Sequence, residues 1–91
     1  MKCFAEIRKL WEEIKSTPEF KLNEFCVNIT EQIYSLMLQK GYDNEEMSRR
    51  LGIKQGLFEW QMEYPDLMTL KDLYRIAEVL DCNLEVSFHE L

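Results

Sequence analysis

The sequence GYDNEEMSRRLGIKQGLFEWQ, residues 41–61, predicts two short helices separated by a glycine. Asp43 and Glu46 stand three residues apart, which is the spacing of a capping box, so a helix is expected to begin here. Gly52 ends this helix after about two turns, because glycine readily adopts the left-handed conformation that closes a helix. A second short helix then runs over residues 54–63.

Longer helices are predicted on both sides of the pair. Apolar residues recur at helical spacing over residues 4–15. A long helix follows, with Thr17 as its cap and Gly41 as its end. After the pair, Thr69 and Asp72 repeat the capping-box spacing and start a last helix. Two short helices joined through a glycine and framed by longer ones form a helix-turn-helix, so we expect an all-α, five-helix bundle.

The C-terminal residues have a different periodicity. Leu84, Val86 and Phe88 alternate with polar residues, which is the period of a β-strand. A lone strand cannot satisfy its own hydrogen bonds, so this one needs a partner. The same strand of a second chain is the expected partner, with an N-terminal segment as the alternative. The predicted organisation is an N-terminal helical extension (1–16), a helix-turn-helix domain (17–82), and a C-terminal strand with an acidic tail (83–91).

Composition narrows the classes of function. Ninety-one residues with 46% hydrophobic content make one small domain. The net charge of −6 excludes a generally basic nucleic-acid protein but leaves room for a local basic patch. No run of apolar residues is long enough to span a membrane. The N-terminal sequence carries charges within its apolar runs, unlike a signal peptide.

The cysteines and the single histidine give no sign of metal binding or catalysis. Cys3, Cys26 and Cys82 are odd in number and lack C-x-x-C spacing, which favours a reducing, cytoplasmic location. His89 has no cysteine or histidine at the spacing of metal ligands. No Ser-His-Asp set or phosphate-binding glycine loop is present. We therefore expect neither an enzyme nor a cofactor or metal.

The helices and turns predicted above resemble those of the Cro/C1-type (XRE family) helix-turn-helix regulators. The likeness covers about residues 20–88 and needs no gap after Gly41. The small residue Ser48, the turn glycine Gly52 and apolar Phe58 match the family pattern, and T-L-x-x-L-x-x-I-A-x-x-L-D-C at residues 69–82 is its most specific part. The N-terminal extension is similar to small variants that include HigA-type antitoxins and regulators of phages and mobile elements.

This resemblance implies a transcriptional regulator, an autorepressor or an antitoxin, that binds operator DNA as a homodimer. The helix over residues 54–63 would lie in the major groove of the double-stranded DNA. The resemblance places base-reading positions at Lys54, Gln55, Gly56, Leu57, Glu59 and Trp60. It places phosphate contacts at Asn44, Arg49 and Arg50.

Several positions depart from the family pattern. Lys54 replaces the usual Ser or Thr cap, and Glu59 would bring negative charge toward phosphates. Leu57, Trp60 and Tyr64 form an apolar stripe on the helix expected to read DNA. This stripe packs on a neighbouring helix or the dimer mate, binds another protein, or touches DNA directly.

The stripe supports an alternative function: a protein-binding module on a repurposed helix-turn-helix. It would neutralise a toxin or, as a phage-encoded inhibitor, bind another protein. In addition to Leu57, Trp60 and Tyr64, the candidate protein contacts include Leu84, Val86 and Phe88 of the terminal strand.

Overall fold

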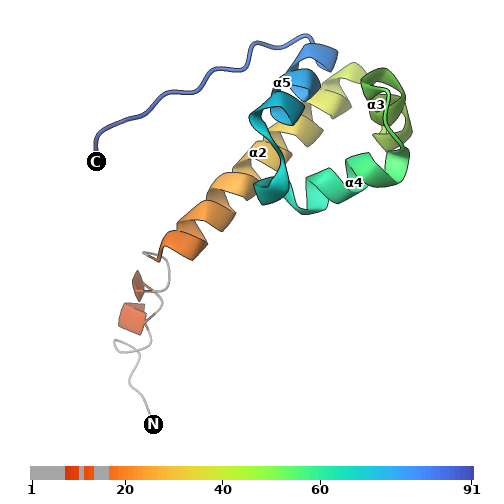
Figure 1. Ribbon diagram of the computed structural model, residues 1–91. Coiled ribbons are helices and arrows are strands. Elements are labelled where there is room, and N and C mark those ends of the chain that lie inside the picture. Colours follow the sequence, from red (N-terminus) through yellow and green to blue (C-terminus); the bar gives the residue numbers. More distant parts are fainter. Residues whose placement is uncertain (1–7, 11, 14–16) are drawn as a thin grey trace.

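The computed structural model describes residues 8–10, 12–13 and 17–91. These residues form an all-α fold (Figure 1). Residues 8–10 and 12–13 are helical, and the remainder of the extension predicted over residues 4–15 lies outside the described residues. The later elements are α2 (Pro18–Lys40), α3 (Asn44–Leu51), α4 (Gln55–Glu63), the 3-10 turn η1 (Pro65–Leu67) and α5 (Leu70–Val79).

The predicted caps set the ends of these helices. The Thr17 hydroxyl accepts a hydrogen bond from the Phe20 amide at the start of α2. Asp43 accepts one from the Glu46 amide at 2.8 Å, which starts α3. Thr69 and Asp72 form both bonds of the capping box that starts α5, each 3.1 Å long. Three of the predicted helix starts are therefore confirmed.

Two glycines end helices as the sequence predicts. Gly41 after α2 and Gly52 after α3 have φ angles of 72° and 71°, in the left-handed region that favours glycine. α4 ends before Pro65, which begins a short 3-10 turn that was not predicted. α4 begins at Gln55, one residue later than predicted, with Lys54 as its cap.

One hydrophobic core joins four helices. Buried side chains from α2, α3, α4 and α5 form a single cluster, in which Phe58 and Met47 are fully enclosed. α3 packs against α4 and α5, while α2 packs against η1. The N-terminal half of α2 projects away from this packed end, as Figure 1 shows, and its Phe25 side chain is exposed. The radius of gyration, 17.1 Å, exceeds the roughly 12 Å of a compact domain of this length.

Residues 82–91 form neither helix nor strand in the single chain. The tail leaves the end of α5 as an extended segment whose Leu84, Val86 and Phe88 are exposed (Figure 1). The strand predicted for residues 84–88 is therefore absent from one chain alone, and it stays a prediction for a pair of chains. Within the described part of the chain, no helix combines the length and apolar content that crossing a membrane requires.

Candidate nucleic-acid interface

The turn between α3 and α4 is held by backbone hydrogen bonds. The Gly52 amide donates to the Arg49 carbonyl at 3.2 Å, and the Ile53 amide donates to the Ser48 carbonyl at 3.0 Å. At the start of α4, the Lys54 carbonyl accepts a hydrogen bond from the Leu57 amide at 3.0 Å. This short, hydrogen-bonded turn fixes the end of α3 beside the start of α4.

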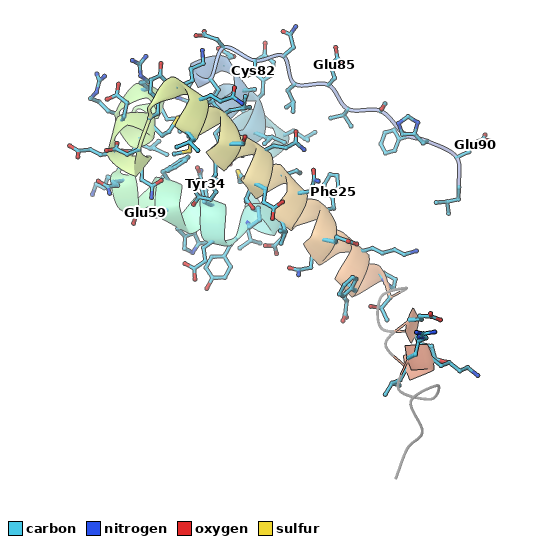
Figure 2. The ribbon with its side chains drawn as sticks, turned by 180° about the vertical axis from the view of Figure 1, so that it is seen from behind. Phe25, Tyr34, Glu59, Cys82, Glu85 and Glu90 are labelled. Atoms are coloured by element: carbon cyan, nitrogen blue, oxygen red, sulfur yellow. The ribbon has the colours of Figure 1, made fainter. Side chains whose placement is uncertain are left out.

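Burial of one side of α4 determines what the other side presents. Phe58 and Met62 lie in the core. The side chains on the opposite side of α4 therefore face outward. All six predicted base-reading positions are exposed: Lys54, Gln55, Gly56, Leu57, Glu59 and Trp60. Figure 2 shows Glu59 on the outer side of this helix. The structure thus leaves all six predicted residues accessible on α4 and its cap.

The two predicted phosphate-binding arginines share one carboxylate. Arg49 donates to Glu46 from Nε at 3.0 Å and from Nη2 at 2.6 Å. Arg50 donates to the same group from Nε at 2.8 Å, and its guanidinium lies 4.3 Å from the centre of the Tyr42 ring. A guanidinium has five N–H donors, so each arginine keeps others for a phosphate.

These contacts change the titration of the carboxylate and of one guanidinium. The hydrogen bonds from Arg49, reinforced by those from Arg50, hold the pKa of Glu46 below its ordinary value. The Glu46 carboxylate in turn raises the pKa of Arg49. Glu46 and Arg49 are therefore both charged at neutral pH, and the cluster sets two guanidinium groups against one carboxylate.

The other predicted DNA contacts differ in whether their side chains already have a partner within the chain. Gln55 donates from Nε2 to the Glu59 carboxylate at 2.8 Å, one turn along α4. Lys54 is exposed, and no described carboxylate lies within salt-bridge distance of it. Asn44 is the first residue of α3 and is half-buried. Lys54 is thus the cation most readily available to a ligand on this surface.

One polar residue at this site has no counterpart among the predicted positions. Arg75 of α5 donates from Nη2 to the Leu51 carbonyl at 2.9 Å, which ties α5 to the last turn of α3. The two residues are 24 positions apart, so no local spacing could have revealed the bond. Arg75 positions the end of α3, where Arg49 and Arg50 stand.

Charge divides sharply along this surface. Residues 49–58 contain three cations, Arg49, Arg50 and Lys54, and no acid. Residues 59–67 contain three acids, Glu59, Glu63 and Asp66, and no cation. The boundary falls within α4.

The predicted protein-contact residues fall into two separate groups. Leu57, Trp60 and Tyr64 lie on α4 and its cap and are 46%, 44% and 44% exposed. The rings of Trp60 and Tyr64 are tilted against each other with centroids 5.6 Å apart. Leu84 and Val86 instead border a groove of about 600 Å³ against α2 and α5. In Figure 2 the tail carries Glu85 and Glu90 away from α4, so the two groups form no common surface.

Nothing in the described residues points to metal chemistry. No group of three or more His, Cys, Asp or Glu side chains there is arranged to hold a metal ion. Cys26 is buried, and Cys82 is half-buried.

Comparison with protein-family models, with curated proteins and with solved structures gives no match for this chain. The resemblance to the Cro/C1-type regulators therefore rests on the residues quoted from the sequence.

Proposed function

We propose that this chain is a sequence-specific DNA-binding regulator in which α3 and α4 act as a helix-turn-helix. The observation that carries this proposal is the cluster of exposed cations Arg49, Arg50 and Lys54, which outnumber the one carboxylate, Glu46, that pairs with them, in a protein of net charge −6. Local excess positive charge is what phosphate binding needs, whatever the charge elsewhere. The proposal agrees with the roles that the family resemblance implies for the same residues.

In this proposal α4 enters the major groove with its first turn leading. Lys54 reaches a guanine or a phosphate, and the Gln55 amide reads adenine through a bidentate contact. Gln55 must first exchange its bond to Glu59 for the base, which makes Glu59 part of the reading surface. Leu57 fits the methyl group of thymine, and Gly56 lets the backbone approach closely.

Phosphate contacts come from α3 and set the orientation on the duplex. Arg49 and Arg50 use the N–H groups that Glu46 leaves free. Asn44 adds its amide and the backbone N–H groups at the helix start. These contacts carry affinity but little sequence information.

A homodimer is part of the proposal. The chain is more extended than a compact domain, and its tail leaves Leu84, Val86 and Phe88 without cover. Pairing of residues 84–88 between two chains satisfies both tails and buries their apolar side chains. Such a dimer reads two half-sites about 34 Å apart, one helical turn of DNA. Binding at its own promoter makes the protein an autorepressor.

The test is fluorescence anisotropy with the upstream promoter fragment and a scrambled duplex, at about 50 and 200 mM salt. We expect tighter binding to the promoter at both salt concentrations. Gln55→Ala should cost about 1–3 kcal/mol on the promoter and little on the scrambled duplex.

Arg49→Ala with Arg50→Ala should weaken both complexes and reduce the salt slope by about 1.8, for two lost phosphate contacts. Lys71→Ala is the matched control, because Lys71 is an exposed cation on α5 outside the proposed surface. Equal losses from Lys71→Ala and from the double arginine variant would contradict the assignment. So would a Gln55→Ala protein that binds the promoter like the wild type.

A further inference from the structure

A second hollow lies at the C-terminal end of α4, away from the first turn of that helix. It is a groove of about 480 Å³ between the N-terminal half of α2 and the segment that joins α4 to η1. That volume is within the range of about 300–1,000 Å³ typical of ligand pockets. Its apolar lining comprises Leu22, Cys26, Val27, Met62, Tyr64 and Pro65. Leu22, Val27 and Tyr64 are exposed, so the groove presents uncovered apolar surface.

The charges around this groove have one sign. Its charged lining residues are Glu19 on α2, Glu63 on α4 and Asp66 on η1. No lysine or arginine is among the described residues that line it. The three carboxylates come from three different elements, so the negative potential surrounds the apolar floor rather than one end of a helix.

This combination selects among possible occupants. DNA is unsuited, because its phosphates would meet three carboxylates and no cation. An entirely apolar occupant would cover the floor but leave the three carboxylates of the rim without opposite charge. A segment with apolar side chains flanked by Lys or Arg fills the floor and neutralises the rim.

We propose that the groove between α2 and α4–η1 binds a basic, amphipathic segment of a partner protein. Apolar side chains of the partner lie against Leu22, Val27 and Tyr64, while its cations pair with Glu63 and Asp66. Tyr64 also connects the groove to Trp60, and an exposed Trp–Tyr pair is typical of the centre of a protein interface. This surface goes beyond the proposed DNA binding and shares none of the charged residues used there.

The test uses a fluorescein-labelled synthetic peptide of about 14 residues, which makes four helical turns. Its leucines follow i, i+3, i+4, i+7 spacing and its other positions are lysine, and a second peptide has glutamate in place of each lysine. Anisotropy gives the dissociation constant. In a Trp11→Phe background Trp60 is the remaining tryptophan, so its emission reports occupancy beside Tyr64.

We expect the lysine peptide to bind and to change Trp60 emission, and the glutamate peptide to do neither. Glu63→Lys with Asp66→Lys should weaken binding of the lysine peptide by at least about tenfold, because like charges then face each other. The matched control is Glu24→Lys with Glu31→Lys, which makes the same charge change at exposed positions of α2 outside the groove. This control should retain most of the affinity.

Three results would overturn the proposal: no binding of the lysine peptide, equal binding of both peptides, or equal losses from the groove and control variants. The last would mean that the peptide responds only to net charge. Circular dichroism of each variant verifies that the helices are intact. Promoter binding by the groove variants is measured in parallel, so failure here and failure of the DNA proposal give different results.

Discussion

Residues 49–57 and residues 59–66 occupy neighbouring parts of one surface and carry opposite charge. The first stretch has three cations and no acid, and the second has three acids and no cation. Both depend on α4, whose buried Phe58 stands at the boundary. A net charge of −6 therefore does not determine what an individual surface can bind. It also separates the two proposals, since nucleic acid suits the first stretch and a basic protein suits the second.

The largest expected effect comes from a core substitution that disrupts both proposed binding surfaces. Phe58→Ala should lower the free energy of unfolding by about 3–5 kcal/mol, because the side chain is fully buried and its loss leaves a cavity in the only core of the described residues. Urea denaturation measures this change. Promoter and peptide binding should fall together. A variant that kept one activity and lost the other would show that the two surfaces do not share α4 as their support.

A pair of glycine substitutions separates stability from binding. Gly52→Ala should cost about 1–2 kcal/mol, because φ is +71° there and a side chain makes this conformation unfavourable. Gly56→Ala should instead stabilise the protein by about 0.5–1 kcal/mol, since its φ is ordinary and a Cβ there meets nothing within 4 Å. The added methyl group should nevertheless weaken promoter binding. Thermal denaturation and anisotropy on both variants measure the two quantities, and unchanged promoter affinity of Gly56→Ala would contradict close approach of α4 to DNA.

Removing the negative charge of Glu59 should change DNA affinity by a smaller factor. Glu59→Gln removes the first acid that follows the cationic stretch along α4, while keeping a partner for Gln55. We expect promoter affinity to rise about two- to fivefold at low salt, and less at high salt where exposed charges are screened. Glu78→Gln on α5 is the control. Equal gains from both substitutions would assign the effect to net charge rather than to the boundary.

The smallest effect concerns the carboxylate shared by the two arginines. The pKa of Glu46 is lowered in the folded protein, so its contribution to stability is present above the pH at which an ordinary glutamate titrates, about 4.3. That contribution is lost as the pH falls through the lowered pKa. The difference in melting temperature between wild type and Glu46→Gln should therefore shrink on acidification. A difference that is the same at neutral and strongly acidic pH would show that the ion pairs contribute nothing to it.

The same substitution tests the DNA proposal at neutral pH. Glu46→Gln frees Arg49 and Arg50 from their carboxylate, so affinity for the scrambled duplex should increase slightly. The salt slope should not decrease. A decrease would mean that Glu46 is needed to hold the arginines toward the phosphates.

Local sequence signals predicted the elements well. Thr17, Asp43 and Thr69 are each short polar side chains that satisfy amides at a helix start, and they start helices where expected. The ends at Gly41 and Gly52 follow from glycine's access to positive φ. Such signals operate within a few residues, so they are visible before any packing is known.

Features that join distant parts of the sequence leave no such local signal. The bond from Arg75 to Leu51 and the groove between α2 and η1 join residues far apart in the sequence. The spacing of Glu46 to Arg49 and Arg50 did contain a signal, since residues three and four apart are neighbours on a helix. The same holds for Gln55 and Glu59, so those two engagements could have been predicted and were not.

The ends of α4 have a consequence for motion. Lys54 supplies no side-chain hydrogen bond to the start of this helix, Gly56 lies in its first turn, and Tyr64 closes it outside the left-handed conformation. The first and last turns of α4 therefore fray at lower free energy than its middle, which Phe58 and Met62 hold in the core. Amide hydrogens in these end turns should thus exchange early, and either partner, by binding, should slow their exchange. The helix that carries both surfaces is then also the one whose order a ligand most readily changes.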